Sequence, residues 1–156
     1  MGYAQISRHR SVTDSNAAVR VDQHGAEFIN LYAASHTKGQ IKVVTYDGDE
    51  ASNPSAVTPA TSAVYQKVGV CTKTSATAGY VEYQIKGDCT FALVEGTTDV
   101  AKGDFLEVLN GETSLKKDAT TRSVNSVAIA QAAQTADSSV ATSVYLIGER
   151  VIIAAS

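Results

Sequence analysis

An alternation of apolar and polar residues over positions 80–85 is the clearest pattern in this chain. Its apolar members fall on one side of an extended backbone and are Val81, Tyr83 and Ile85. A period of two is typical of a β-strand with one buried face. Because Gly87 and Asp88 interrupt the pattern, we predict that this strand ends there and that another spans 89–94.

Similar short patterns recur along the chain and predict further strands. The predicted strands span residues 19–21, 27–32, 41–46, 104–109, 112–115, 140–147 and 151–153. The Asn110-Gly111 dipeptide predicts a tight hairpin of type I′, which needs a positive φ at both central residues. The alanines of residues 127–133 allow a helix, but the alternation of Val127 and Ile129 favours a strand. The pattern therefore predicts an all-β protein, either a small β-barrel or a β-sandwich.

Two polar stretches predict how the chain is organised around these strands. Residues 1–18 lack any hydrophobic period, and we interpret them as an extended N-terminal arm. Residues 50–63 contain both prolines among small polar residues, which predicts a long loop. With 156 residues the chain is long enough for one full core and short for two. We therefore expect a single β-rich domain over 19–156.

Composition adds two constraints on partners. Ala, Val, Thr and Ser make up 72 of the 156 residues, and Trp is absent. These small or β-branched side chains suit closely packed sheets, but each buries little area, so a partner or another copy would add stability. A net charge of −3 gives no electrostatic reason to expect nucleic acid as the partner. No apolar run approaches the roughly 20 residues of a membrane span, so we expect no membrane partner.

The cysteines and the N-terminus indicate where the protein is made. Cys71 and Cys89 are the only cysteines, too few for a disulfide framework. Two buried free thiols are the favoured interpretation, and a single disulfide is the alternative. The N-terminus has no hydrophobic segment of the kind that a secretory signal needs. We therefore expect synthesis in a cytoplasm, without processing.

The sequence contains no recognisable constellation for catalysis or for metal binding. The motifs Gly-x-Ser-x-Gly, His-Glu-x-x-His, Walker A and Gly-x-Gly-x-x-Gly are absent. We interpret His9, His24 and His36 as surface or turn residues. The acidic residues at 47–50 lack the spacing of a calcium loop and are better explained by turn formation. We expect no enzymatic activity, no cofactor and no metal ion.

Basic residues near the N-terminus are the candidates for a docking site. Arg8, His9 and Arg10 form a small cluster in the predicted arm, and Arg20 follows in the first predicted strand. Complementary charge mainly sets the orientation and the rate of association. We predict that these four residues dock on an acidic surface of a partner or of a neighbouring subunit. The alternative for the arm is a frayed terminus.

Four short segments between residues 68 and 108 share a style of strand and turn. They are Val68-Gly69-Val70, Ala78-Gly79-Tyr80-Val81, Ile85-Lys86-Gly87 and Val100-Ala101-Lys102-Gly103-Asp104. With the strands predicted near 127–130 and 140–146, which follow in a similar order, this part of the chain resembles the capsid decoration, or cement, proteins of tailed bacteriophages. The resemblance covers about the C-terminal two-thirds of the chain.

The resemblance implies a β-rich structural protein of the virion without catalytic residues. Proteins of this family bind the outside of an expanded capsid, often as trimers at three-fold or quasi-three-fold positions. They bridge neighbouring capsid subunits and resist the pressure of packaged DNA. For this chain, the resemblance implies the major capsid protein as partner, a homotrimer, and a location on the capsid exterior after synthesis in the host cytoplasm.

Two other functions stay open from the sequence. A carbohydrate- or cell-surface-binding β-sandwich of a fibre or tail would expose aromatic rings, for which Tyr65, Tyr80 and Tyr83 are candidates. A small trimeric β enzyme of nucleotide metabolism would need a phosphate-binding loop and a catalytic aspartate in context, and the sequence offers neither.

Overall fold

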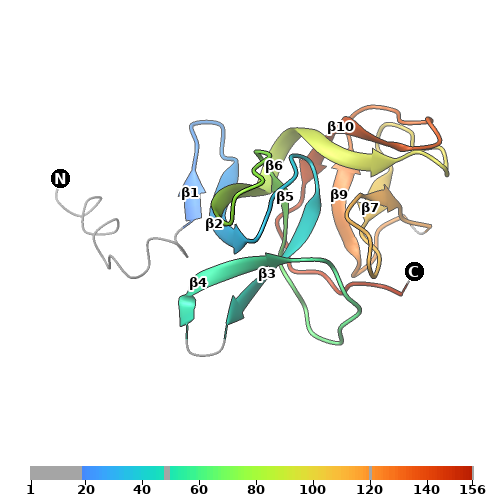
Figure 1. Cartoon of the computed structure of the whole chain (residues 1–156). Coiled ribbons are helices and arrows are strands. Elements are labelled where there is room, and N and C mark those ends of the chain that lie inside the picture. The colour runs from blue at the N-terminus through green and yellow to red at the C-terminus, as the bar shows by residue number, and fades with distance from the viewer. Residues whose placement is uncertain (1–18, 48–49, 120, 156) are drawn as a thin grey trace.

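The computed structural model describes residues 19–47, 50–119 and 121–155, and over these residues it forms strands and no helix (Figure 1). The predicted arm, residues 1–18, lies outside the described residues. The strands are β1 (Val19–Val21), β2 (Glu27–Ala33), β3 (Ile41–Asp47), β4 (Glu50–Val57), β5 (Val68–Cys71), β6 (Gly79–Glu95), β7 (Phe105–Glu107), β8 (Lys116–Lys117), β9 (Ser126–Ala130) and β10 (Ser139–Leu146). The predicted all-β fold is confirmed.

Five of the strands close into a β-barrel. Around the barrel the order is β2, β4, β3, β5, β6 and back to β2. Neighbouring strands are antiparallel except β2 and β4, which are parallel and meet only at Tyr32 and Ser55. β1 pairs with the start of β2, where Val19 lies opposite Ile29. The barrel therefore closes through one pair of residues.

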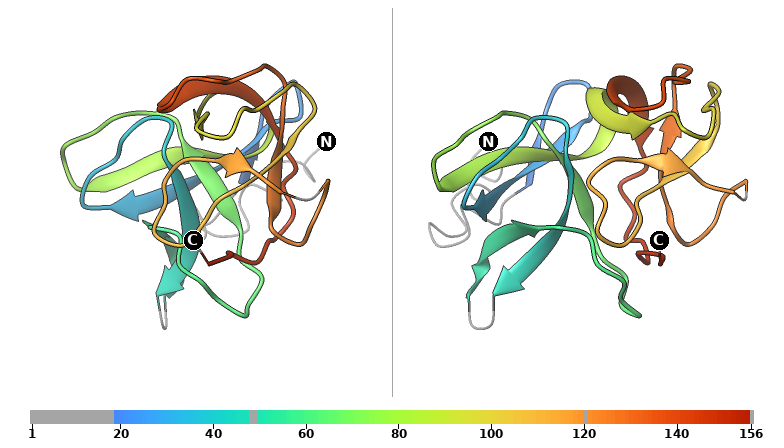
Figure 2. Two further views of the ribbon diagram at one scale, coloured as in Figure 1. Left: turned by 90° about the vertical axis from the view of Figure 1, so that its right-hand side faces the viewer. Right: turned by 45° about the vertical axis from the view of Figure 1, so that its right-hand side comes forward.

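The second half of β6 leaves the barrel and begins a second layer of sheet. β10 pairs with β6 from Gly87 to Glu95, and β9, β7 and β8 follow in that order. Figure 2 shows the barrel strands and this layer side by side from two further directions. One strand of 17 residues thus belongs to both parts.

Two hydrophobic cores correspond to these two parts. The first consists of barrel residues and contains Ile29, Leu31, Cys71, Tyr83 and Ile85. The second joins the barrel strands β3 and β5 to the second layer, and its barrel members are Ile41, Val43, Val68 and Val70. All four residues of β5 are buried, because alternate side chains of this strand serve the two cores.

The predicted break at Gly87 is wrong, because β6 runs through it without interruption. Gly87 has a φ of +97°, and a Cβ atom there would lie 3.0 Å from the Cα atom of Ala26. A glycine therefore lets the strand bend closely over Ala26 while its pairing continues, with Leu146 opposite Gly87.

The predicted loop over 50–63 is wrong in its first half, where β4 forms over Glu50–Val57 and pairs with β3. Proline lacks an N–H group and is tolerated mainly in edge strands. β4 pairs with β2 at Ser55 alone. Most of the β2-facing edge of β4 therefore makes no ladder hydrogen bonds that a proline would remove. The loop begins only after Val57.

The predicted type I′ hairpin at Asn110-Gly111 is also wrong. Within the described residues only glycines have a positive φ, so Asn110 cannot fit that turn. The turn is closed by a hydrogen bond from the Glu112 N–H to the Leu109 carbonyl (3.0 Å). The Asn110 side chain instead accepts a hydrogen bond from the Thr61 N–H (3.0 Å). The loop after β4 thus contacts this turn through the Asn110 side chain and through the Gly111 N–H, which donates to the Pro59 carbonyl (2.8 Å).

Three smaller expectations are also resolved. Residues 127–130 lie in strand β9, as the alternation favours. Cys71 and Cys89 are both buried and free, which confirms the favoured interpretation. The strand predicted at 151–153 is wrong, because Val151 forms only an isolated bridge, with Gln66.

Gly39 offers a test of how tightly the two parts are joined. Its N–H donates to the Cys71 carbonyl (2.8 Å), and its carbonyl accepts from the Leu93 N–H (3.0 Å). Its φ is +90°, and a Cβ atom would lie 2.6 Å from the Phe91 carbonyl oxygen. Gly103 has a similar φ of +95° but no atom within 4 Å of such a Cβ.

We predict that Gly39→Ala lowers the free energy of unfolding more than Gly103→Ala. The matched variant Gly103→Ala should cost about 1–2 kcal/mol, the cost of a left-handed alanine. Gly39→Ala should cost about 1–3 kcal/mol more, because its methyl group collides with backbone. Urea denaturation of both variants measures the difference, and equal losses would contradict the close approach.

Candidate partner-docking site

Arg20, the one predicted docking residue that the structure describes, is held by contacts within the chain. The antiparallel register places Arg20 of β1 opposite Phe28 of β2, and the guanidinium carbon lies 4.2 Å from the Phe28 ring centroid. Arg20 Nε donates to Glu82 Oε2 (2.6 Å), and Nη2 donates to Glu82 Oε1 (3.0 Å). This forked pairing fixes the guanidinium plane, and the hydrogen bond to Glu82 raises the pKa of Arg20.

These contacts give Arg20 a structural role. They fasten β1, a strand of three residues, to both β2 and β6 at the point where the described chain begins. The side chain of Arg20 is still 52% exposed. Arg8, His9 and Arg10 lie outside the described residues, so docking by all four residues stays a prediction. What the structure adds is a fixed starting point for the segment that precedes Arg20.

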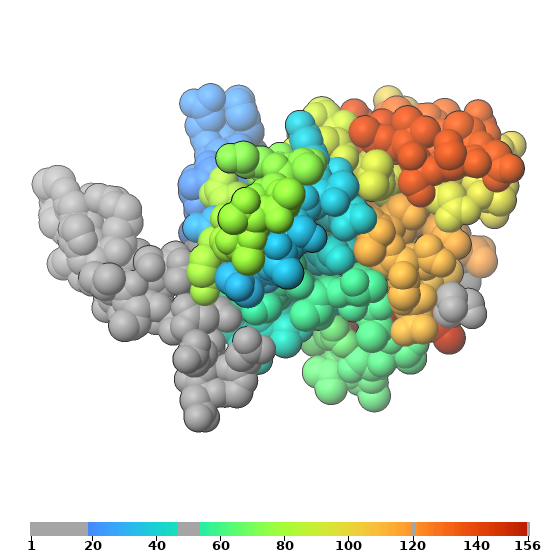
Figure 3. All heavy atoms as spheres, in the orientation of Figure 1, coloured from blue at the N-terminus to red at the C-terminus, as the bar shows by residue number. Residues whose placement is uncertain are grey.

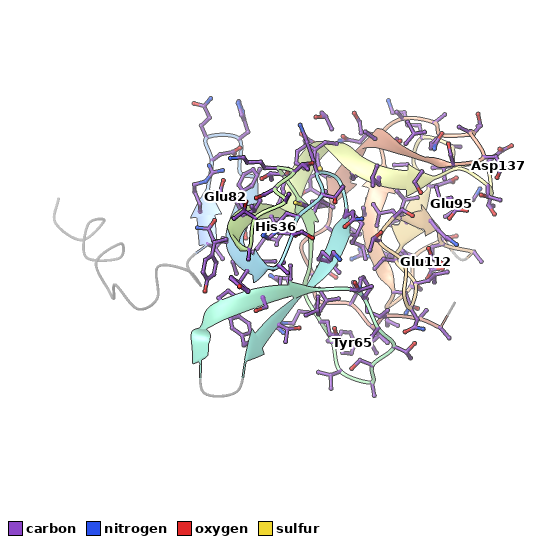
Figure 4. The ribbon with its side chains drawn as sticks, viewed as in Figure 1. His36, Tyr65, Glu82, Glu95, Glu112 and Asp137 are labelled. Carbon is purple, nitrogen blue, oxygen red and sulfur yellow. The ribbon has the colours of Figure 1, made fainter. Side chains whose placement is uncertain are left out.

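The surface around this ion pair is aromatic as well as charged. On β2 and β6 the outward side chains alternate with those of the barrel core and include Phe28, Asn30, Tyr32, Tyr80 and Glu82. Tyr32 and Tyr80 lie opposite each other, with ring centroids 5.6 Å apart in an edge-to-face arrangement. Both rings are about two-fifths exposed (43% and 41%). We call this surface the β2–β6 outer face; Glu82 marks it in Figure 4.

His36 is buried, so the prediction of a surface or turn residue is wrong for this histidine. Its Nε2 lies 2.8 Å from the Gly79 carbonyl, and its Nδ1 lies 2.9 Å from the Tyr83 hydroxyl. Because a carbonyl only accepts, Nε2 carries the proton and Nδ1 accepts from Tyr83. Burial raises the pKa of Tyr83. With both nitrogens occupied, His36 fixes a loop to the barrel and has no nitrogen left for a metal or a substrate.

The other candidate groups of the described chain are also without reactive geometry. In the described residues no three His, Cys, Asp or Glu side chains are grouped so as to hold a metal ion. Burial raises the pKa of the Cys89 thiol to about 11, which leaves almost no thiolate at neutral pH. His24 is an exposed turn residue, as predicted. No helix in the described part of the chain could cross a membrane.

Carboxylates gather near the end of β6, but their charges are largely compensated. Glu95 forms an ion pair with Lys116 (3.2 Å) and accepts a hydrogen bond from Thr97. These interactions lower the pKa of Glu95, with the Thr97 hydrogen bond as the larger cause. Figure 4 shows Glu95 and Asp137 on this side of the molecule. The group is therefore a paired surface network.

Of the aromatic residues predicted as a carbohydrate platform, Tyr83 is fully buried and is excluded from that role. Tyr65 and Tyr80 are exposed by 48% and 41%. Tyr65 lies on the segment between β4 and β5, whereas Tyr80 lies on the β2–β6 outer face. Sequence reasoning missed both His36 and the Arg20–Glu82 pair, because the partners lie 43 to 62 residues away in the chain.

Comparison with known proteins adds no assignment to this geometry. No protein-family model matches the chain, and no curated protein is significantly similar to it.

We predict that Arg20→Ala frees β1 from the barrel without unfolding the protein. Exposed ion pairs contribute about 0–1 kcal/mol to global stability, so the effect should be local. Amide hydrogen exchange in Val19–Val21 should accelerate. Arg122→Ala is the matched control, because Arg122 forms an exposed pair with Glu149 (3.0 Å) elsewhere. Unchanged protection of β1 in the Arg20 variant would contradict the anchoring role.

We predict that Tyr83→Phe destabilises the barrel, because it leaves His36 Nδ1 buried without a donor. Losing one partner of a buried hydrogen bond costs about 1–3 kcal/mol. Tyr145→Phe is the control: Tyr145 is 38% exposed, and its change should stay within about 0.5 kcal/mol. Thermal and urea unfolding of both variants give the comparison. A Tyr83 variant as stable as the control would show that the His36 contact contributes nothing.

Proposed function

We propose that this protein is a structural component of a phage virion. In this proposal it binds the outer surface of the capsid as a homotrimer, with the major capsid protein as partner, and cements neighbouring capsid subunits. It performs no catalysis. Its task is to supply contact area, of which a stable protein–protein interface buries on the order of 1,200–2,000 Å².

The observation that carries the proposal is where the resembling residues lie in the fold. Three of the four resembling segments lie on β5 and on the first half of β6, whereas residues 100–104 lie in the turn that precedes β7. These strands belong to the framework that joins the barrel to the second layer. Homologous proteins keep the strands of a shared fold better than its surface loops. A resemblance located on framework strands therefore supports a shared fold.

The ends of the sheet also support an assembled state. The sheet begins with β1 and ends with β8, strands of three and two residues. Short edge strands limit uncontrolled pairing with other chains. Val19 and Val21 nevertheless expose 44% and 60% of their surface at the β1 edge. Closed cyclic assembly would cover such residues while leaving no free edge for further growth.

A second candidate function is carbohydrate binding by a fibre or tail module. The edge-to-face pair of Tyr32 and Tyr80 favours it, because two exposed rings on one barrel surface could stack on a sugar. A glycan-binding screen of the purified chain separates the two functions. Specific binding that Tyr80→Ala abolishes would favour the carbohydrate module.

The copy number of the chain in purified virus particles tests the proposed function. Quantitative mass spectrometry should find a number comparable with that of the major capsid protein. A handful of copies per particle would indicate a fibre or tail part instead. Absence from the particle would refute a structural role in the virion.

We predict that deleting residues 1–16 weakens capsid attachment more than it weakens folding. The deletion removes Arg8, His9 and Arg10 but leaves Arg20 and its ion pair with Glu82 intact. Thermal stability should stay near that of the full chain, while occupancy on particles lacking the wild-type chain should fall. Unchanged occupancy would count against the arm as an attachment element.

A further inference from the structure

A groove lies between the end of β3, the segment that precedes β5 and the C-terminal segment after β10. It has a volume of about 440 Å³ and is lined by Tyr46, Val64, Tyr65, Lys67 and Arg150, among others. A second hollow of about 470 Å³ shares Tyr65 and Arg150 with it. We call the two together the Tyr65 groove. Tyr65 is labelled in Figure 4, and Figure 3 shows its segment as a projection at the lower edge of the molecule.

Two cations, Lys67 and Arg150, line the first hollow of this groove. Gln66 and Val151 form an antiparallel bridge and exchange both hydrogen bonds, at 2.7 and 2.8 Å. This bridge brings the segments that carry Lys67 and Arg150 together, and both side chains line the same hollow. Like charges that line one hollow repel each other.

Among the described residues, neither cation forms an ion pair with a carboxylate. Of the three arginines in the described chain, Arg20 pairs with Glu82 and Arg122 pairs with Glu149. Arg150 pairs with none of the described residues, although Glu149 precedes it directly. Lys67 likewise forms no ion pair with the described residues, whereas Lys86, Lys116 and Lys117 each have one. Four other lysines, Lys38, Lys42, Lys73 and Lys102, also form none there, but they do not line the groove beside a second cation. Glu149 lines the second hollow, but it pairs with Arg122. Lys67 and Arg150, which both line the first hollow, therefore leave a place for an anion.

Among the mixed polar and apolar side chains that line the groove are three large apolar ones that are exposed. Val64 is 67% exposed, Tyr65 48% and Tyr46 44%. Large exposed apolar side chains gathered beside polar groups mark a surface that contacts another molecule. A free inorganic anion would use the two cations and leave these side chains in water. A ligand that carries both carboxylates and apolar side chains would use the whole groove.

We propose that the Tyr65 groove binds an acidic segment of a partner protein. A carboxylate of that segment sits between Lys67 and Arg150, and a neighbouring apolar side chain packs against Val64 and Tyr65. A nucleic acid is a poorer fit, since tracking a phosphate backbone requires a longer row of cations. The inference rests on the proposed function for the identity of the partner, which would then be a capsid subunit. It adds a docking surface on elements other than β1, which carries Arg20.

The binding test uses the full chain and a capped hexapeptide of alternating glutamate and leucine. Calorimetric titration should detect binding to the wild type. The double variant Lys67→Glu with Arg150→Glu should lose at least about tenfold in affinity, or 1.4 kcal/mol. The control Lys73→Glu with Lys102→Glu makes the same change in net charge at two exposed lysines outside the groove, and it should bind like the wild type. Equal loss in both double variants, or no binding to the wild type, would overturn the proposal.

Two further measurements tell a protein segment from a free anion as the ligand of the groove and separate a loss of binding from a loss of folding. Inorganic phosphate should compete only weakly with the peptide, and binding of phosphate without the peptide would overturn the assignment of a protein segment. Arg150→Gln removes the repulsion without reversing the charge. Its thermal midpoint should equal or exceed that of the wild type, and its affinity for the peptide should fall. A lower midpoint with unchanged affinity would make Arg150 a structural residue and refute the site.

Attachment to virus particles separates this inference from the proposed function. Occupancy of the groove double variant should fall well below that of the Lys73–Lys102 control. If the chain is in the particle and both variants attach equally, the groove inference fails while the proposed function stands. If the chain is absent from the particle, the proposed function fails and the peptide titration still decides whether the groove binds acidic segments.

Discussion

The fold depends on one constraint, that β6 must pair in two different sheets along a single strand. Its first half pairs with β2 and β5, and its second half pairs with β10. The strand achieves this by bending at Gly87 and by a shift of register opposite β10 between Thr142 and Val144. A bulge of this kind changes which side chains face inward. Tyr83 and Ile85, before the bend at Gly87, serve the barrel core, and Cys89 after it already serves the second core. The bulge between Cys89 and Ala92 then lets Ala92 and Val94 face the same second core.

The same strand, β6, also supplies the partners of the two anchoring contacts of the candidate site, the Arg20–Glu82 ion pair and the His36–Tyr83 hydrogen bond. Glu82 points outward from β6 and holds Arg20, while Tyr83, the next residue, points inward and holds His36. Because successive side chains of a strand point to opposite faces, one strand holds an ion pair on the surface and a hydrogen bond in the interior. This explains how a chain rich in small side chains can fix its β1 strand. The two anchoring contacts rest on adjacent residues of the most extensively paired strand.

Sequence reasoning succeeded where a structure depends on local pattern and failed where it depends on distant partners. The alternation around Tyr83 predicted both the strand and its buried face. The bend at Gly87 was misjudged, because the close approach of Ala26 that explains it lies far away in the sequence. β4 was missed because its composition is that of a loop, and only pairing with β3 makes it a strand. The burial of His36 likewise depends on Gly79 and Tyr83, which no local signal indicates.

Two cations line one hollow of the Tyr65 groove, and this shared position is what the proposed docking uses. Most acidic side chains near the second layer have a lysine or a hydroxyl partner, as Glu95 and Asp104 do. A surface whose charges are paired in this way attracts a charged partner only weakly. Lys67 and Arg150 line one hollow together and form no ion pair with the described residues, and so in the proposed complex they give an approaching acidic segment a preferred orientation. Specificity at such a surface comes from these two cations and affinity from the exposed apolar side chains, because desolvating those side chains contributes free energy that exposed ion pairs do not.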